Sequence, residues 1–427
     1  MRKNVGLDSL ERVAGNGLLH RRLFLRQGAA LLGAAGVTVL TARSAQAAPP
    51  DLPAWMQAPG APMSGYGNRA TYESGVQRLV NAQPGTTGSG GSRTPIESLE
   101  GIITPSSLHF ERHHSGVPDI DPDQHQVLLH GLVERPLLFS MNALARYPLV
   151  SRIQFLECSG NSGGNNGAEP PQQTAGGIHG LVSCSDWTGV PLGILLEEAG
   201  VKPEGRWLLA EGADAASMSR SVPMAKAMDD AILAIYQNGE RLRPEQGYPV
   251  RLFLPGYEGN MNVKWLRRIK VTAEPTMTKD ETSKYSDLQT NGRSLLFTFP
   301  MEAKSVITSP SGMQKMQGPG LYQISGLAWS GFGRIRRVDV SADGGKTWGE
   351  AALEGPALPK ALTRFRMPWR WDGSPSVLQS RAIDETGAVQ PSRPALMAAR
   401  GAAYRYHYNA VQSWSVAAAG DVSNVYA

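Results

Sequence analysis

The stretch Phe155-Leu156-Glu157-Cys158-Ser159-Gly160-Asn161 joins an apolar run to a loop of small and polar residues. The apolar run predicts the end of a strand, and the almost apolar-free residues 159–167 let a ligand approach the backbone closely. Cys158, at the junction, is one of only two cysteines in the chain. Its thiolate could hold a soft metal, although a free cysteine is more often a small buried apolar side chain. This segment alone leaves both interpretations open.

The N-terminus has the composition of an export signal. Arg21-Arg22 is followed by an uncharged stretch over 27–42 and by Ala45-Gln46-Ala47, which is the pattern of a twin-arginine signal with a small-residue cleavage site. The uncharged stretch is shorter than the roughly 20 strongly apolar residues of a membrane span. We therefore expect residues 1–47 to direct export to the periplasm. Twin-arginine export of a folded chain also suggests a cofactor that is inserted beforehand.

Charge and cysteine content exclude several classes of function. Residues 1–47 hold seven of the 42 Lys and Arg but only two of the 37 Asp and Glu, so the remaining chain is close to neutral. We expect neither nucleic acid nor an anionic membrane as a partner, and no membrane insertion. A disulfide between Cys158 and Cys184 would stabilise the chain by about 3 kcal/mol, but a ligand cysteine cannot form it. No C-x-x-C-H motif for c-type haem occurs.

Composition divides the rest of the chain into three parts. Residues 48–101 are rich in Pro and Gly and predict an extended arm or linker with one short helix over 72–81. Residues 102–300 mix strands and helices and predict an α+β domain, whereas 301–427 predict an all-β immunoglobulin-like sandwich. The elements expected in these two domains are strands over 127–133, 207–210, 250–255, 321–329, 334–341 and 377–384, a helix over 192–199 and a hairpin turn at 343–346.

Two other motifs do not withstand inspection. Gly345-Lys346-Thr347 resembles the end of a phosphate-binding loop, but Val340 stands where that loop needs a glycine. His109, His113 and His114 could form a zinc cluster, yet prolines flank the stretch and no acid stands at a metalloprotease spacing. We expect these histidines to be solvated or to bind phosphate.

Several separated motifs, in one order along the chain, are together typical of a single enzyme family. They are Phe-Glu-Arg-His-His at 110–114, Glu-Cys-Ser-Gly-Asn at 157–161, Ser-Val-Pro-Met-Ala-Lys-Ala-Met at 221–228, Gly-Tyr-Pro-Val-Arg at 247–251, Val-Lys-Trp-Leu at 263–266, Ala-Trp-Ser-Gly at 328–331 and Val-Asp-Val-Ser-Ala-Asp-Gly-Gly-Lys-Thr-Trp at 338–348. From about residue 102 to the C-terminus the chain resembles the sulfite oxidase family of molybdenum enzymes. The resemblance implies a molybdenum cofactor with one molybdopterin in the α+β domain, and a β domain that forms dimers.

The resemblance also implies roles for individual residues. Cys158 would be the thiolate ligand of molybdenum, and Arg112, Tyr285 and, by a looser match, Arg400 would complete the catalytic residues. The residues implied to bind the cofactor are Phe110, Arg112, His114, Cys158, Asp214, Gln246, Arg251, Asn262 and Lys264. Arg and Lys suit a phosphate, and Asp accepts hydrogen bonds from pterin N–H groups. Cys184 matches no ligand and is expected to pack in the core.

Three stretches depart from the family pattern. Ser162 and Gly163 stand where sulfite oxidases have two arginines, the second of which contacts the sulfite anion. Residues 174–180 replace bulk and charge by glycines and His179, which predicts a wider pocket in which His179 could do part of the missing arginine's work. Gln246 replaces the usual His, and it can still donate a hydrogen bond to the cofactor.

These departures make the chain most similar, within the family, to the molybdenum subunits of Sox sulfane dehydrogenases. The likeness implies oxygen-atom transfer from Mo(VI)=O to the outer sulfur of a persulfide on a sulfur carrier protein, in thiosulfate and sulfur oxidation. Electrons would pass to a c-type cytochrome subunit, and the chain would form a homodimer or a heterotetramer with that subunit. Three alternatives stay open: a periplasmic sulfite dehydrogenase acting on free sulfite, a nitrate-reducing relative, and an exported binding or assembly protein without catalytic activity.

Overall fold

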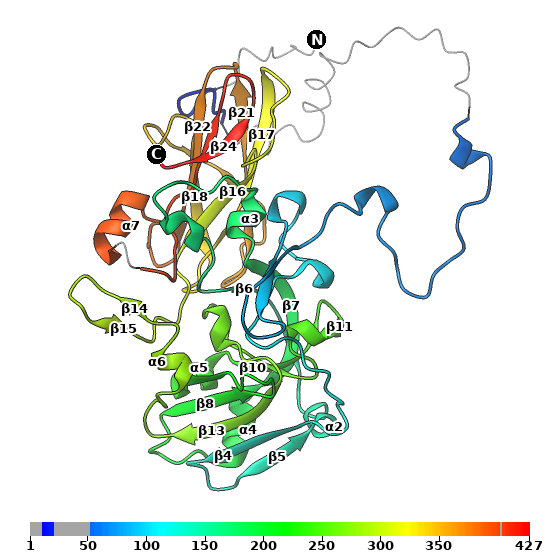
Figure 1. The fold of residues 1–427 in the computed structure, drawn as a ribbon, viewed down its shortest axis with the longest axis vertical. Helices are drawn as coiled ribbons and strands as arrows, with labels where there is room; N and C mark the ends of the chain where they lie inside the picture. The colour runs from blue at the N-terminus through cyan, green and yellow to red at the C-terminus, as the bar shows by residue number, and fades with distance from the viewer. Residues whose placement is uncertain (1–10, 21–51, 402–403) are drawn as a thin grey trace, which may run out of the picture.

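The computed structural model describes residues 11–20, 52–401 and 404–427. They form a lower and an upper lobe stacked along the long axis of the molecule, with an extended N-terminal arm at one side (Figure 1). Most of the expected export signal lies outside the described residues. Within them, no helix is both long and apolar enough to cross a membrane.

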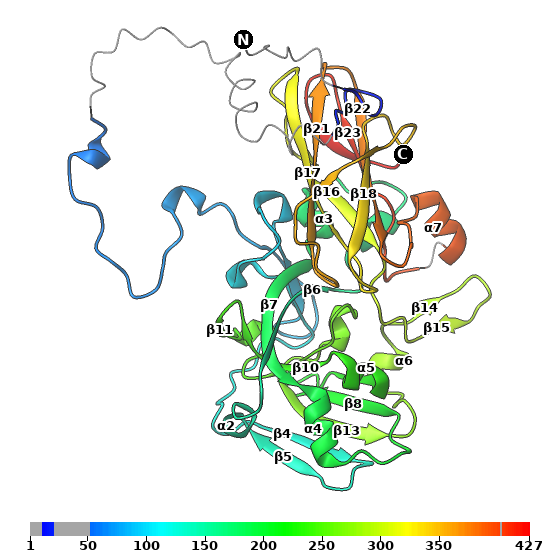
Figure 2. The ribbon, with the colours of Figure 1, turned by 180° about the vertical axis from the view of Figure 1, so that it is seen from behind.

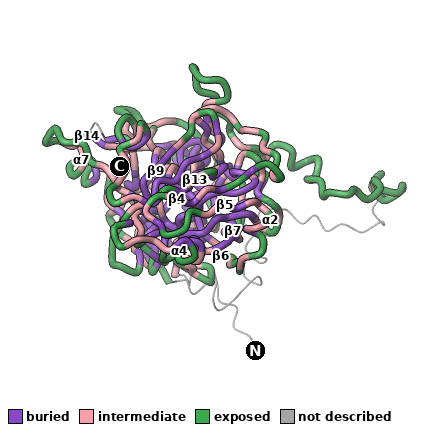
Figure 3. The backbone as a smooth tube through the Cα atoms, turned by 90° about the horizontal axis from the view of Figure 1, so that it is seen from below, coloured by how far each residue is buried: buried purple, intermediate pink, exposed green. Residues whose placement is uncertain are grey.

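A five-stranded sheet forms the base of the lower lobe. Its order is β5-β4-β13-β8-β9, and only the pair β4 and β13 is parallel. Seen from below, buried residues alternate with intermediate or exposed ones along β4, β5 and β13, whereas β8 and β9 are mostly buried (Figure 3). The elements are β4 (Gln126–Gly131), β5 (Leu137–Ser140), β8 (Trp207–Gly212), β9 (Ser219–Pro223), β13 (Leu266–Thr272), α2 (Met141–Leu144), α4 (Leu192–Ala199), α5 (Met224–Asp229) and α6 (Lys279–Thr282).

Helix α4 has the bounds that the sequence predicts. Its buried residues are Leu192, Leu195, Leu196 and Ala199, which recur at the spacing of one helix face. The helix ends at Gly200, whose φ of +68° is a left-handed conformation that glycine adopts without strain.

A second sheet connects the two lobes (Figure 2). Its order is β11-β10-β7-β6, with β12 also paired to β10. Its long hairpin β6–β7 buries Phe155 and Cys184 in the core of the upper lobe, whereas Leu156 and Trp187 face a core of the lower lobe. The lobes therefore share packing. The strands are β6 (Val150–Glu157), β7 (Val182–Pro191), β10 (Ile232–Gln237), β11 (Glu240–Arg241) and β12 (Arg251–Phe253).

The upper lobe is the predicted sandwich, in which two sheets have the orders β16-β17-β21-β20 and β19-β18-β22-β23-β24. Its largest fully buried side chains include Trp329, Trp369, Trp371 and Trp414. Gly344 and Gly345 have φ values of +71° and +84° in the predicted turn. The elements are β16 (Lys304–Ser309), β17 (Gly320–Trp329), β18 (Ile335–Ser341), β19 (Gly349–Glu350), β20 (Ala352–Leu353), β21 (Thr363–Trp371), β22 (Ser376–Asp384), α7 (Arg393–Arg400), β23 (Ser413–Val416) and β24 (Val422–Val425), and a small hairpin of β14 (Asp287–Leu288) and β15 (Ser294–Leu295) lies beside them.

The prediction of an extended arm or linker over residues 48–101 is wrong for the second half of that stretch. Strands β1 (Leu79–Ala82) and β2 (Gly90–Arg93) form a hairpin, and β2 also pairs with β3 (Glu111–His113) of the lower lobe. The helix expected over 72–81 is replaced by a single turn at Thr71–Glu73 and by β1. Pairing with a distant strand overrides the local preference of a glycine-rich segment.

A short part of the expected export signal also packs against the upper lobe. Leu18 is fully buried there, and Leu19 is 3% exposed. The N–H of Leu19 donates to the carbonyl of Pro368 (3.0 Å), and the N–H of Arg370 donates to that of Gly17 (2.9 Å). Residues 17–19 thus extend the sheet at an edge of β21.

Candidate active site

Cys158 directly follows strand β6, as the sequence predicts, and starts a tight loop. Its N–H donates to the carbonyl of Leu181 (2.9 Å), and the N–H of Asn161 donates to the carbonyl of Cys158 (2.9 Å). The Asn161 side chain donates to Glu157 (2.9 Å) and accepts from the N–H of Leu181 (3.1 Å). Burial raises the pKa of the Cys158 thiol, so binding a metal ion there must release the proton. Cys158 lines two adjoining cavities, here called inner and outer.

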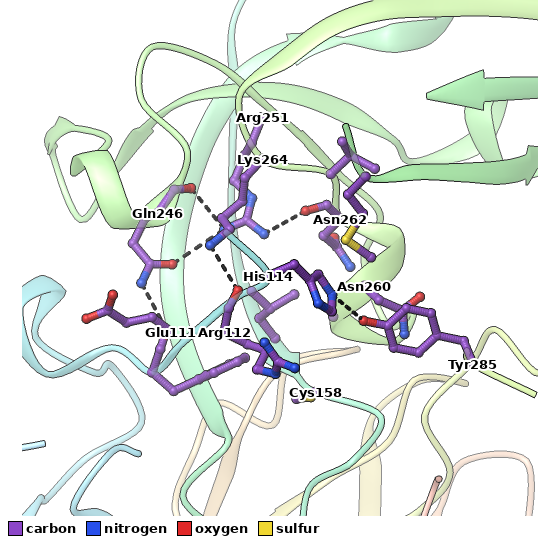
Figure 4. Close-up of a pocket in the computed structure, with 15 residues that line it drawn as sticks. Glu111, Arg112, His114, Cys158, Gln246, Arg251, Asn260, Asn262, Lys264 and Tyr285 are labelled. Atoms are coloured by element: carbon purple, nitrogen blue, oxygen red, sulfur yellow. Dashed lines mark hydrogen bonds between the residues drawn. The ribbon is translucent and has the colours of Figure 1, made fainter. Parts of the chain in front are cut away.

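The inner cavity holds about 540 Å³ of space, part of it open to solvent. It gathers most of the predicted cofactor residues around one volume, with Cys158 at one end (Figure 4). The predicted residues that line it are Phe110, Arg112, His114, Cys158, Gln246, Arg251, Asn262, Lys264 and Tyr285. Met218 and Asn260 also line it and had no sequence signal of their own, and Glu111 lines it as a member of the motif at 110–114 to which no role was assigned.

Arg251 is a buried cation without a counter-charge. It is 2% exposed, and its guanidinium donates only to the carbonyls of Gln246 (3.1 Å) and Asn262 (2.8 Å), with a longer contact to the Gln246 amide oxygen (3.5 Å). Its Nε is buried and has no hydrogen-bond partner in the described part of the chain. Burial lowers the pKa of Arg251 to about 9. Because an unpaired buried charge is costly, this cavity suits an anionic ligand.

Lys264 adds a second cation to the inner cavity. Its Nζ lies 2.7 Å from His113 Nδ1 and donates to the carbonyls of Glu245 (3.1 Å) and Arg112 (3.2 Å). Burial, together with the nearby charge of Arg251, lowers the pKa of Lys264 well below its ordinary value. A bound phosphate would reverse this effect, because an opposite charge favours the protonated amine.

His114 and Tyr285 form a polar pair beside Cys158. His114 Nε2 lies 2.9 Å from the Tyr285 hydroxyl, and Lys284 Nζ lies 3.3 Å from His114 Nδ1. Burial, reinforced by the charge of Arg112, lowers the pKa of His114 to about 3, and burial raises that of Tyr285. Since Lys284 can only donate, Nδ1 accepts and Nε2–H donates to the tyrosine oxygen. The Tyr285 proton is therefore left to point into the site.

The outer cavity holds about 1120 Å³ of space, part of it open to solvent, and it also reaches Cys158. One wall is the hairpin β1–β2, and the upper lobe contributes Tyr406. Its cations are Arg93, Arg112 and Lys284, and no Asp or Glu of the described residues lines it. This outer wall was not predicted, because Arg93 lies in the stretch expected to be a linker and Tyr406 belongs to no motif.

Comparison with known proteins assigns both lobes. The family description "oxidoreductase molybdopterin binding domain" matches residues 114–279, and "Mo-co oxidoreductase dimerisation domain" matches 297–413. Sulfite oxidase of Gallus gallus is 30% identical over 345 residues, which cover 74% of this chain and 72% of that protein. The chain belongs to the sulfite oxidase family of molybdenum oxidoreductases.

Two further relatives differ in length and closeness. NADH nitrate reductase of Solanum lycopersicum is 32% identical over 71% of this chain, but the match spans only 38% of that reductase. The crystal structure of the sulfane dehydrogenase SoxCD from Paracoccus pantotrophus shares 48% sequence identity with a TM-score of 0.85. That likeness covers 88% of this chain and 97% of the matched one. The predicted likeness to sulfane dehydrogenases within the sulfite oxidase family is confirmed.

The family's cofactor is molybdenum with one molybdopterin, and the inner cavity fits it. The unpartnered Nε of Arg251 and the buried amine of Lys264 can hold a phosphate. No group of three His, Cys, Asp or Glu side chains in the described ranges could hold a metal ion. The three histidines at 109–114 have other partners: His109 Nδ1 lies 2.9 Å from the carbonyl of Phe110, His113 Nε2 lies 2.6 Å from Glu111, and His114 Nε2 lies 2.9 Å from the Tyr285 hydroxyl. A metal bound at Cys158 would take its remaining ligands from the pterin and solvent.

Not every predicted site residue of this sulfite oxidase family member reaches a cavity beside Cys158. Asp214 lies next to the inner cavity without lining it, and it accepts from the N–H of Met218 (3.3 Å) and Ser115 Oγ (3.4 Å). The structure does not bring Arg400 to either cavity: at the end of α7 it pairs with Glu302 and lines a separate cavity. Helix α7 ends there, and the next described residues lead to Tyr406, which is the side chain the upper lobe contributes.

The expectation that His179 would take over an arginine's work is also wrong. His179 is fully buried between Ser162 Oγ (2.6 Å) and Gln412 Oε1 (3.0 Å) and lines neither cavity. Burial lowers its pKa well below the ordinary value. Cys184 packs in the core as expected, and both cysteines are free thiols.

Proposed function

We propose that this chain is the molybdenum subunit of a periplasmic sulfane dehydrogenase. Its substrate is the outer sulfur of a persulfide carried by a sulfur carrier protein, and its electron acceptor is a c-type cytochrome subunit. The observation that carries the proposal is the outer cavity, which is larger than the inner one, is rich in cations and adjoins Cys158. The 48% identity to a chain of sulfane dehydrogenase SoxCD supports the same substrate class.

The residues of the inner cavity bind the cofactor in this proposal. Cys158 would ligate the molybdenum, and Arg251 and Lys264 would bind the pterin phosphate. Phe110, Gln246 and Asn262, which line the same cavity, would contact the pterin, and Asp214 would accept hydrogen bonds beside it. When bound, the cofactor supplies oxygen-atom transfer and accepts the two electrons of each round.

The protein's own side chains position the sulfur and the protons. Arg112, whose guanidinium donates to Gln83 Oε1 (3.1 Å) at the cavity wall, stabilises the negative charge that develops on the sulfur oxygens. Tyr285, held by His114 Nε2–H, donates its free proton toward the reacting oxygen. Because its pKa is raised by burial, Tyr285 acts as a neutral donor at every working pH.

Electrons and protons leave the site separately. Each oxygen atom that water delivers to the outer sulfur releases two protons and two electrons. The chain carries no c-type haem motif, so the electrons need a partner that accepts them one at a time. The match of residues 297–413 to a dimerisation domain supports a homodimer, or a heterotetramer with the cytochrome.

Steady-state kinetics tests the substrate. Purified holoenzyme is given either a carrier protein loaded with a persulfide or free sulfite, with the same c-type cytochrome as acceptor. We expect kcat/KM for the persulfide carrier to exceed that for sulfite. Faster turnover of sulfite would instead establish the periplasmic sulfite dehydrogenase, which the likeness to Gallus gallus sulfite oxidase keeps as the second candidate.

Metal analysis and fractionation test the other two parts of the proposal. We expect about one molybdenum per chain in protein recovered from the periplasm, and retention in the cytoplasm when Arg21 and Arg22 are changed to Lys. Functional protein without molybdenum would instead indicate a non-catalytic binding protein. Periplasmic protein from the Lys-Lys variant would contradict twin-arginine export.

A further inference from the structure

Arg93 enters the outer cavity from a part of the chain that the family motifs do not include. It is the last residue of β2, and Gly91, two residues before it in that strand, stands opposite Arg112 in the register with β3. The hairpin thus brings Arg93 to the same cavity as Arg112, Lys284 and Cys158. No local sequence pattern predicts this placement, because it depends on strand pairing.

Of the three cations in the outer cavity, Arg93 is the one with an unused buried donor. Arg112 donates to the carbonyl of Gly90 (3.3 Å) and to Gln83 Oε1 (3.1 Å), and Lys284 contacts His114 (3.3 Å). By contrast, no described residue accepts a hydrogen bond from Arg93 or forms an ion pair with it, and its buried Nε has no partner among them. Arg93 is partly exposed and also lines a neighbouring cavity that holds Glu97. An unsatisfied guanidinium in a cavity without acids is a site for an anion.

The loop after Cys158 has no cationic side chain at Gly163, the position at which a sulfite oxidase has its second arginine. Ser162 is 2% exposed and is held by Lys304 Nζ (2.7 Å) and His179. A Cβ at Gly163 would meet only the backbone oxygen of Arg405, at 3.6 Å. This loop therefore faces the upper lobe, and the position of the missing arginine is left open.

We propose that Arg93 is a substrate-binding residue that replaces this arginine from the opposite wall. Its guanidinium binds the anionic oxygens of the sulfonate-like group that forms on the outer sulfur, together with Arg112. The forked donors of arginine match two oxygens of such a group. With the cation moved to the hairpin, the side of the Cys158 loop stays free of bulk, which leaves room for a peptide that carries the sulfur. This inference rests on the sulfane dehydrogenase proposed above.

The test compares Arg93→Gln and Arg93→Lys with Arg146→Gln, an exposed arginine of the lower lobe that lines none of these cavities. Each holoenzyme is titrated calorimetrically with sulfate and with thiosulfate, and its molybdenum content is measured. Loss of one charge-assisted contact is worth about tenfold or more in affinity. We expect the dissociation constants of both anions to rise by about that factor in Arg93→Gln, with partial recovery in Arg93→Lys.

Kinetics then separates Arg93 from the choice of substrate. With the persulfide carrier, Arg93→Gln should raise KM by about tenfold and change kcat far less. If the wild-type enzyme prefers sulfite, the proposed substrate fails, but the anion titration still decides the role of Arg93. Unchanged anion affinity in a fully loaded Arg93→Gln enzyme would overturn the inference. A loss of molybdenum in that variant would also overturn it, because Arg93 would then serve the cofactor.

Discussion

The inner and outer cavities share Cys158, Arg112, His114 and Tyr285, but they differ in how the chain builds them. The inner cavity is lined by short contiguous motifs of the lower lobe and holds buried cations against backbone carbonyls. The outer cavity is assembled from the hairpin β1–β2, Lys284 and Tyr406, which are far apart in the sequence. Residues that bind a cofactor of fixed shape can lie in short sequence motifs. The residues that line a substrate cavity can come from segments far apart in the sequence, and these segments can differ between relatives.

The largest effect is expected at Cys158, where the two cavities meet. Cys158→Ser removes the soft thiolate ligand but leaves Arg251 and Lys264 in place, so activity should fall to background while most pterin stays bound. Activity and pterin content, measured on the same preparation, check this. Cys184→Ser is the matched control, because Cys184 lies in the core of the upper lobe and lines neither cavity. Equal losses of activity in the two variants would contradict the assignment of Cys158 as the ligand and Cys184 as a core residue.

The next effect separates cofactor loading from stability. Arg251→Met removes a buried charge that has no counter-ion in the cofactor-free chain, so relief of that charge offsets the lost carbonyl hydrogen bonds. We expect molybdenum and pterin content to fall by about tenfold or more, while the Tm of the cofactor-free chain changes little. A variant that loads fully would show that the inner cavity does not need this cation.

This contrast also explains what the sequence predicted and what it did not. The sandwich, helix α4 and nine inner-cavity residues follow from periodicity and from motifs in which ligand contacts cluster locally. The hairpin β1–β2 was expected to be a linker because its glycines weaken any local signal, and only pairing with β3 orders it. Arg400 was assigned by a loose match to the family, and that match carried no information on where α7 ends, so the structure places Arg400 away from both cavities.

A substitution in the hairpin should disturb the outer cavity more than the inner one. A Cβ at Gly91 would lie 2.7 Å from the carbonyl oxygen of Glu111, so Gly91→Ala must displace β2 from β3. We expect a loss of about 1–3 kcal/mol in stability and a higher KM for the persulfide carrier at normal molybdenum content. Gly67→Ala is the control, because a Cβ there meets nothing within 4 Å. A parallel loss of molybdenum would mean that the hairpin supports the inner cavity as well.

The smallest effect concerns the contact that holds the Tyr406 segment against the lower lobe. The N–H of His407 donates to the carbonyl of Ser159 (2.7 Å), and its Nε2 lies 3.2 Å from Glu258 Oε2. Burial opposes the charged imidazole, but the hydrogen bond and charge of Glu258 outweigh burial and raise the pKa of His407. Glu302 acts in the same direction and Arg400 against it. Burial also opposes the ionised Glu258, yet His407 lowers the pKa of that carboxyl.

The sign of the pH dependence follows from these two shifts. The raised pKa of His407 gives stability that is complete below its unfolded value of about 6.5 and is lost as pH rises through the folded value. The lowered pKa of Glu258 gives stability that is complete above about 4.3 and is lost as pH falls through its folded value. The ion pair of His407 and Glu258 therefore contributes most to stability between these two pH values.

His407→Asn should lower Tm most near pH 6. The difference in stability between variant and wild type should shrink toward pH 9, by about 1.4 kcal/mol per unit of pKa shift. A Tm difference that stays constant from pH 6 to pH 9 would show that His407 holds the outer wall by packing rather than by charge. Molybdenum content should be unchanged in either case, because His407 lines neither cavity.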